Sequence, residues 1–77
     1  MRLSEAEVGK TYLIVSVEVN GNMKYVLYTH GLLPGMTVRV RCLKTSRNAM
    51  LVEIVPLWRL IAISKDIAKF LVVIPQS

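Results

Sequence analysis

The sequence predicts a single all-β domain with short helices, in which about five antiparallel strands form a small closed or nearly closed barrel. Three observations lead to this prediction. Short runs of β-branched and aromatic residues recur, turn residues separate them at short intervals, and the chain has only 77 residues. Short strands at such spacing are typical of small barrels. No linker or internal repeat divides the chain, so residues 1–77 are expected to form one domain.

Residues 3–7 are expected to form a short helical turn that ends at Gly9, because Ser4 and Glu7 have the spacing of a capping box. The first strand follows at residues 11–19, where β-branched residues dominate. Apolar and polar positions alternate along this strand. Its two predicted faces carry Leu13, Val15 and Val17 on one side, and Tyr12, Ile14, Ser16 and Glu18 on the other.

The next segment has two interpretations. An Asn-Gly pair at residues 20–21 is ordinarily a hairpin signal, and residues 23–29 contain enough β-forming side chains for a return strand. A helix is the rival interpretation, because Gly31 offers a C-terminal stop and apolar side chains recur at helical spacing. These are Met23, Val26, Leu27 and His30. Local sequence alone leaves both interpretations open.

A turn with two glycines and a proline leads into the second strand, residues 36–44. Gly31 suits the left-handed position beyond a helix end, and Pro34-Gly35 suits a type II turn. Alternation places Arg39, Arg41 and Leu43 on one face of this strand, and Val38, Val40 and Cys42 on the other. Cys42 is therefore expected to be a buried small apolar residue.

Three further strands are predicted at residues 49–55, 58–64 and 70–74. A polar turn at residues 45–48 precedes them. Pro56 is expected at a bend or an unpaired edge position, and Pro75 is expected to stop the last strand. Ser64 is expected to cap a helical turn that ends at Lys69.

Composition limits the classes of function. The longest apolar run, residues 70–74, is far shorter than the roughly 18 residues that suggest a membrane span, and the first residues lack the apolar core of a secretory signal. A cytoplasmic protein is therefore expected. The single cysteine, Cys42, excludes an internal disulfide and a Cys-rich metal site. The net charge of +5 permits an acidic partner, a nucleic acid or an anionic membrane surface.

The sequence predicts no enzyme, because it contains no Ser-His-Asp set, Gly-rich phosphate loop, paired-carboxylate motif or HExxH. His30, the only histidine, is the candidate ligand for iron or another transition metal ion. A role at a helix end is favoured over it, since a tight site needs three or four converging donors. The other available donors are Cys42, Glu5, Glu7, Glu18, Glu53 and Asp66.

A basic stripe runs along the second strand and the turn after it, formed by Arg39, Arg41, Lys44 and Arg47. A solvated strand face is the favoured interpretation. Nucleic-acid binding is disfavoured, because a small barrel that binds nucleic acid interleaves aromatic residues with basic ones, and here the aromatics lie elsewhere. Trp58 is expected to pack in the core or at a barrel end rather than to act as an exposed anchor.

The order of these landmarks resembles the FeoA family, the ferrous iron transport protein A domain. The family pattern of a leucine near the start, a glycine before the first strand and a short helix corresponds to Leu3, Gly9 and residues 23–30. The motif Gly-Leu-x-Pro-Gly-x-x-Val-x-Val corresponds to residues 31–40, and residues 61–73 are similar to the family's closing segment. The resemblance covers almost the whole chain.

The resemblance implies an SH3-like β-barrel and a helix at residues 23–30. It also implies a small cytoplasmic accessory protein of ferrous iron uptake, which acts as a protein-interaction module for a FeoB-type membrane iron transporter with a cytoplasmic GTPase domain. SH3-like barrels commonly bind through loops and an exposed face. The expected contact residues are Tyr25, Tyr28, Leu33, Pro34, Arg39 and Arg41.

Two alternative functions stay open at this point. One is a transition-metal-binding or iron-regulatory domain, because a similar fold is appended to iron-dependent repressors. The other is a small nucleic-acid-binding barrel that exploits the net charge of +5. A homo-oligomer is a further arrangement to consider, since a domain of this size buries only about 60% of the surface of its unfolded chain.

Overall fold

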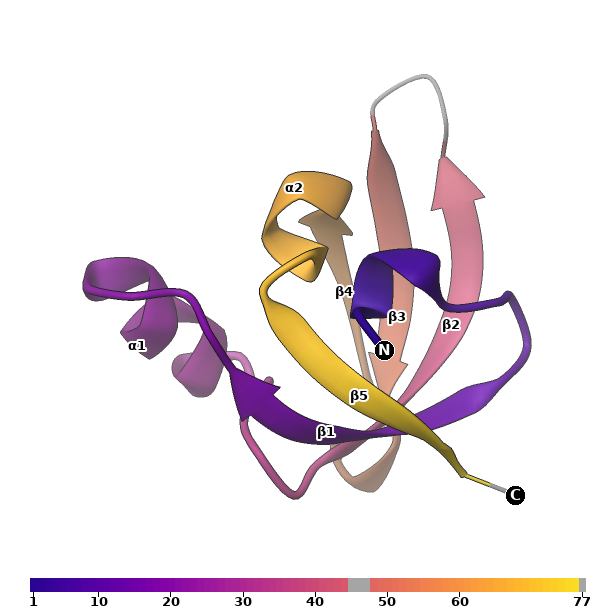
Figure 1. Ribbon diagram of the computed structural model, residues 1–77. Helices are drawn as coiled ribbons and strands as arrows, with labels where there is room; N and C mark the ends of the chain where they lie inside the picture. Colours follow the sequence, from indigo (N-terminus) through magenta and orange to yellow (C-terminus); the bar gives the residue numbers. More distant parts are fainter. Residues whose placement is uncertain (45–47, 77) are drawn as a thin grey trace.

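The computed structural model of the protein describes residues 1–44 and 48–76. Within these residues, five antiparallel strands form one sheet in the order β4-β3-β2-β1-β5, accompanied by short helices (Figure 1). This confirms the predicted mostly-β fold. The elements are η1 (Leu3–Glu5), β1 (Thr11–Val17), α1 (Asn22–Thr29), β2 (Thr37–Lys44), β3 (Ala49–Ile54), η3 (Val55–Leu57), β4 (Arg59–Ser64), α2 (Lys65–Ala68) and β5 (Leu71–Gln76).

The sheet bends over its own core. Figure 1 shows β1 and β5 running across the direction of β2, β3 and β4, so the two groups of strands enclose the interior between them. Every core side chain among the described residues is apolar or the tyrosine Tyr12, and no charged side chain is buried there. The largest fully buried side chains are Leu3, Ile14, Leu32, Met50, Ile54, Leu71, Val38, Val40, Val52 and Val73.

A β-bulge in β1 overturns the predicted faces of the first strand. The register with β5 shifts between Ile14 and Ser16, because one strand supplies an extra residue there. Tyr12 and Ile14 are buried as alternation requires, but beyond the bulge Val17 is buried while Val15 is 47% exposed. The predicted grouping of Val15 with Val17 is therefore wrong, and the strand ends at Val17 rather than at residue 19.

A second bulge moves Cys42 to the outer face of β2. The register with β3 shifts between Val40 and Cys42, which leaves Arg41 as the extra residue. Cys42 now pairs with Leu51, whose strand neighbours Met50 and Val52 point into the core. The prediction that Cys42 shares the buried face of Val40 is wrong, and its side chain is only partly buried.

The ambiguous segment is a helix. Gly21 has φ +70° and lies before α1, so the Asn-Gly pair starts a helix instead of a hairpin. The helix ends in a Schellman motif, in which the Leu32 N–H donates to the Leu27 carbonyl (2.9 Å) and the Gly31 N–H donates to the Tyr28 carbonyl (3.0 Å). Leu27 and Leu32 are both buried, which adds the hydrophobic contact that accompanies this motif.

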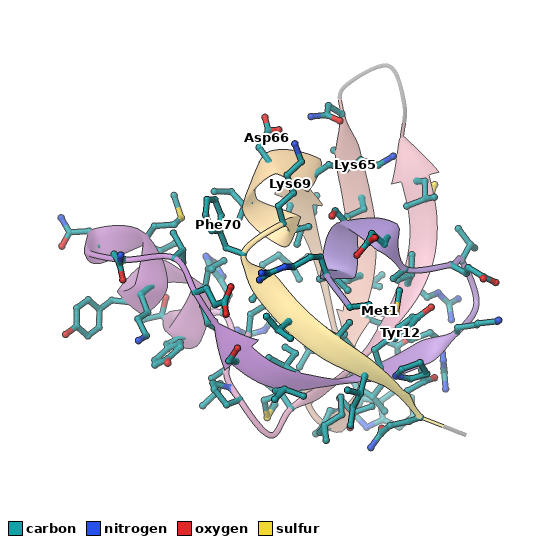
Figure 2. The ribbon with its side chains drawn as sticks, in the orientation of Figure 1. Met1, Tyr12, Lys65, Asp66, Lys69 and Phe70 are labelled. Atoms are coloured by element: carbon teal, nitrogen blue, oxygen red, sulfur yellow. The ribbon has the colours of Figure 1, made fainter. Side chains whose placement is uncertain are left out.

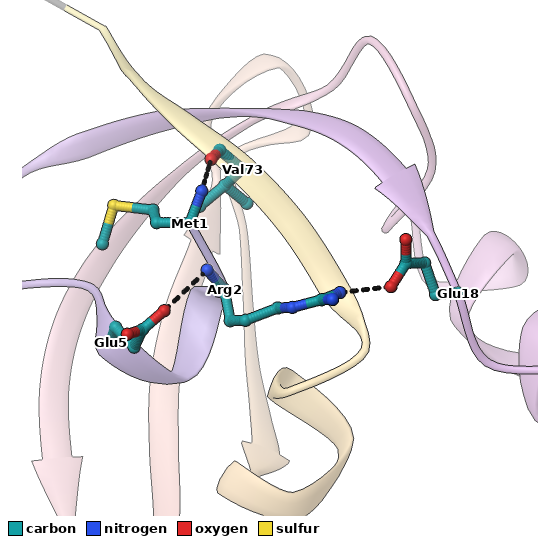
Figure 3. Close-up of polar contacts among 5 residues, drawn as sticks. All are labelled: Met1, Arg2, Glu5, Glu18 and Val73. Atoms are coloured by element: carbon teal, nitrogen blue, oxygen red, sulfur yellow. Dashed lines mark hydrogen bonds and ion pairs between the residues drawn. The ribbon is translucent and has the colours of Figure 1, made fainter.

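The N-terminal segment covers the outer edge of β5. Figure 3 shows the Met1 amino group donating to the Val73 carbonyl at 3.0 Å, and Arg2 forms an isolated bridge with Val72. The Glu5 carboxylate accepts from the Arg2 backbone N–H at 3.0 Å. This contact replaces the predicted capping box between Ser4 and Glu7, which is wrong because the N-cap of η1 is Arg2, two residues before Ser4.

Tyr12 is connected to the same segment. Its hydroxyl accepts a hydrogen bond from the Glu7 backbone N–H at 2.9 Å, although the side chain is only 2% exposed (Figure 2). The ring therefore fills the core while the polar tip holds the chain that leads into β1.

Two proline predictions have different outcomes. Pro56 lies in η3, the bend between β3 and β4, as expected. Pro75 does not stop the last strand, because β5 continues to Gln76 and Pro75 pairs with Tyr12. An edge strand tolerates a residue without an N–H, and β5 is an edge of the sheet.

The last helical turn is confirmed. Ser64 caps α2, and its hydroxyl oxygen accepts from the Ile67 N–H at 3.1 Å. Of the predicted turn at residues 45–48, only Asn48 lies within the described residues.

Candidate functional site

The structure divides the six expected contact residues into two groups. Four of them, Tyr25, Tyr28, Leu33 and Pro34, lie on α1 and on the turn after it, and we call these the helix surface. Arg39 and Arg41 lie on β2, where they share a hollow of about 360 Å³ with Glu53, Trp58 and Leu60. We call these five residues the sheet surface.

Tyr25 is the most prominent side chain of the helix surface, with 69% of its surface exposed. Tyr28 is half-buried and packs against the core, and the Lys24 ammonium nitrogen lies 5.9 Å from the centre of its ring. This distance is within the range of a cation–π interaction. Val26 between them is also 45% exposed. An aromatic and aliphatic patch of this kind is typical of a protein contact.

The turn that carries Leu33 and Pro34 is held firmly against β1. The Leu33 carbonyl accepts from the Met36 N–H at 3.2 Å and Gly35 has φ +94°, which confirms the predicted type II turn. The Gly35 N–H donates to the Ile14 carbonyl, and the Ile14 N–H donates to the Met36 carbonyl, both at 2.9 Å. These three bonds fix the direction of the turn relative to the sheet.

An apolar groove of about 320 Å³ runs beside the helix surface, between α1, β4 and α2. Both Val26 and the exposed histidine His30 line it. The other lining residues are Met23, Leu27, Ile61, Ala62, Ile63, Ser64 and Ile67.

His30 lies at the helix end, as the favoured interpretation expects. Its backbone N–H donates to the carbonyls of Val26 and Leu27, both at 3.2 Å. Within residues 1–44 and 48–76, no three His, Cys, Asp or Glu side chains gather into a group that could hold a metal ion. His30 is exposed and belongs to no such group among the described residues.

The sheet surface follows from the strand register. Arg39 pairs with Glu53, and Glu53 pairs with Leu60, so a cation, an anion and an apolar residue form one row across three strands. The Glu53 oxygen Oε1 lies 3.8 Å from Arg39 Nη1 and 3.4 Å from Arg41 Nη1. One carboxylate thus serves two guanidinium groups. The side chains of Lys44 and Arg47, also predicted for the basic stripe, lie outside the described part of the chain.

Trp58 is the functional candidate that sequence reasoning placed wrongly. The expected packing in the core or at a barrel end is contradicted, because 85% of the residue is exposed. Trp58 has φ +53° at the end of η3, a left-handed conformation that a bulky residue rarely adopts. The signal in the sequence was the preceding Pro56, which makes a turn there and directs the chain away from the core.

A third hollow, of about 540 Å³, is lined by Gly9, Lys10, Thr11, Pro75 and Gln76. Its one described ionisable side chain, Lys10, has an ammonium nitrogen 3.0 Å from a Glu7 carboxylate oxygen. The hydrogen bond to Glu7, and then its negative charge, raise the pKa of Lys10 above its ordinary value of 10.5. The Lys10 side chain is therefore protonated and positively charged near neutral pH.

No helix in the described parts of the chain is both long enough and apolar enough to span a membrane. Figure 2 shows short helical turns only, with charged side chains such as Asp66 and Lys69 on the outer side of α2. These two side chains form an exposed ion pair at 3.6 Å.

The fold defines the class of the protein: a small SH3-like β-domain. A sequence model of the FeoA domain matches residues 1–75, so the chain belongs to the FeoA family. The resemblance proposed from the sequence is thereby confirmed.

Solved structures support the same fold. A protein described as iron uptake regulatory protein (FeoA) has a TM-score of 0.86 at 24% identity, with 99% of this chain and 97% of that chain covered. The FeoA protein from Chlorobium tepidum has a TM-score of 0.90 at 21% identity, with 100% and 71% covered. No curated protein matches the sequence.

A manganese-dependent transcriptional repressor, solved with manganese, contains a similar domain. Its TM-score is 0.90 at 14% identity, and the match covers 99% of this chain but only 36% of the repressor. At this identity the likeness concerns the fold alone. Membership of the FeoA family, a family of small non-catalytic accessory domains, implies a role in ferrous iron uptake.

Proposed function

We propose that the protein is a cytoplasmic, non-enzymatic accessory module of ferrous iron uptake that binds the cytoplasmic part of a FeoB-type membrane iron transporter. The observation that carries the proposal is the helix surface of a FeoA-family chain, where Tyr25 is 69% exposed on a helix whose end is fixed by buried leucines. Exposed aromatic residues on rigid elements are typical centres of protein interfaces.

The proposed contacts have different roles. Tyr25 is the central anchor, and Tyr28 supports it from its half-buried position beside Lys24. Leu33 and Pro34 extend the apolar contact along the turn. Because the turn is already bonded to β1, binding need not order it, and less conformational entropy is lost.

Arg39 and Arg41 are proposed as flanking contacts that draw in acidic groups of the partner. Their side chains are 39% and 51% exposed even though both lie near Glu53. Partly exposed charges at the edge of an interface act mainly on the association rate and its salt dependence.

A titration of the isotope-labelled domain with the detergent-solubilised transporter tests the proposal. We expect localised chemical-shift changes in residues 25–41 and a loss of affinity of about 30-fold in Tyr25→Ala, the size typical of an interface hot spot. Val8→Ala is the control, since Val8 is 52% exposed and belongs neither to α1 nor to the turn after it. Equal binding by a folded Tyr25→Ala variant and by the control would refute the helix surface as the contact.

The transition-metal alternative rests on His30 alone among the described residues. A single imidazole makes a weak site, since tight sites combine three or four donors. Calorimetry of the domain with ferrous iron separates the two functions. Saturable heat that disappears in His30→Ala would favour a metal-binding domain, whereas an absence of heat would favour the accessory module.

A further inference from the structure

We propose that the sheet surface is a docking site for an anionic lipid bilayer, in which Trp58 and Leu60 enter the headgroup region and Arg39 and Arg41 bind lipid phosphate groups. The proposal concerns the isolated domain and lipid, so it does not depend on the transporter interaction.

Trp58 is exposed to solvent at the end of η3. The residue ends η3, where its N–H donates to the Val55 carbonyl at 3.3 Å, and backbone geometry rather than side-chain packing sets its direction. Trp58 is 85% exposed, and the nearby residues Leu57 and Leu60 are 48% and 58% exposed. Tryptophan is enriched at membrane–water interfaces because its ring is apolar and its N–H is polar.

The sheet surface also carries an excess of positive charge beside Trp58 and Leu60. Arg39 and Arg41 share the single carboxylate of Glu53, and Leu60 pairs with Glu53 in the next strand. Two arginines against one carboxylate leave a net charge of +1 at the sheet surface. Glu53 is the inner member of the group, since its side chain is 13% exposed and those of Arg39 and Arg41 are 39% and 51% exposed.

Both features are needed for stable attachment to a membrane surface. Anionic leaflets attract Arg and Lys side chains that lie near the membrane surface. Stable surface binding generally requires this attraction together with an inserted apolar group. The sheet surface supplies an inserted group at the turn and guanidinium groups immediately beside it.

A lipid surface fits this arrangement better than a nucleic acid does. Nucleic-acid-binding barrels stack successive bases on several aromatic side chains. The sheet surface has one aromatic residue, Trp58, and its remaining apolar side chains are aliphatic. Aliphatic side chains such as Leu60 gain free energy by leaving water, which an acyl-chain boundary permits and a phosphate backbone does not.

The test uses Trp58 as its own reporter, because it is the only tryptophan of the chain. The domain is titrated with vesicles of phosphatidylcholine and phosphatidylglycerol in equal parts, and with vesicles of phosphatidylcholine alone. We expect a blue shift of the emission and co-sedimentation with the anionic vesicles only, and a loss of both as salt is raised.

Two pairs of variants distinguish binding through the sheet surface from attraction by the net charge of the whole domain. Arg39→Gln combined with Arg41→Gln is compared with Lys10→Gln combined with Lys69→Gln, which removes the same charge from exposed positions elsewhere. We expect the first pair to weaken vesicle binding by about 10-fold or more and the second pair to change it far less. Circular dichroism confirms that each variant is folded.

Three results would overturn the proposal: no blue shift with anionic vesicles, equal losses in the two pairs of variants, or undiminished co-sedimentation of Trp58→Ala. A blue shift with soluble polyglutamate but not with vesicles would also overturn it, and would assign the sheet surface to an acidic protein.

Discussion

Gly31 occupies a position that no other residue can fill without strain. Its φ of +95° lies in the left-handed region, and a Cβ added there would lie 2.8 Å from Leu57 Cδ1 and 3.2 Å from Ile54 Cδ1. The residue therefore ends α1 and also lets the helix end approach η3. The sequence suggested the first role because glycine suits the left-handed position beyond a helix end, although local patterns left helix and strand open for residues 23–29. It held no signal for the contact with Leu57, which is distant along the chain.

Gly31→Ala should lower the free energy of unfolding by about 1–3 kcal/mol, because alanine is strained at this φ and displaces Leu57. Urea denaturation measures the change. Gly35→Ala is the matched control, since Gly35 has φ +94° but nothing within 4 Å of an added Cβ. A smaller loss in the control is expected, and equal losses would mean that the contact with Leu57 contributes nothing.

At the scale of the elements, sequence reasoning located the strands but not all of their faces. Alternation assigned β1 correctly as far as Ile14 and β2 correctly as far as Val40, and it failed beyond the bulge in each strand. A bulge changes the face of every later residue, and no turn residue marks it in this sequence. The same error hid the outward position of Cys42, while Trp58 was misplaced because turn geometry outweighed its hydrophobicity.

Two valines of β1 give a direct test of its bulge. Val17→Ala should lower the free energy of unfolding by about 1–3 kcal/mol, because Val17 is 7% exposed and its removal leaves a core cavity. Val15→Ala should change it by about 0.5 kcal/mol or less, since Val15 is 47% exposed. Thermal or urea denaturation measures both. Similar losses in the two variants would contradict the bulge and restore simple alternation.

For the whole molecule, the landmarks spread over the chain were more informative than any one segment. Local patterns left residues 23–29 undecided between helix and strand, and the family resemblance chose the helix that the structure shows. The helix surface could be anticipated in this way. The sheet surface could not, because it combines β2, β3 and β4 through a register that only folding establishes.

Stability should vary little with pH across the neutral range, because no charged side chain among the described residues is buried. Lys10 has a raised pKa in the folded state, so its contribution is fully present below its ordinary pKa of 10.5 and is lost as the pH rises through the folded value. Urea denaturation at a series of pH values should show a plateau from about pH 6 to pH 9. A step within this range would contradict the finding that no charged side chain among the described residues is buried.

The apolar interior lets the sequence of such a domain diverge while its fold is kept. Aliphatic side chains exchange with one another at less than about 1.5 kcal/mol when their volume is kept, because dispersion and hydrophobic contacts lack direction. A core of Leu, Ile, Val and Met can therefore accumulate single substitutions among aliphatic residues while the backbone keeps its fold. Distant relatives of this chain are therefore better recognised by the spacing of buried apolar positions and turn glycines than by sequence identity.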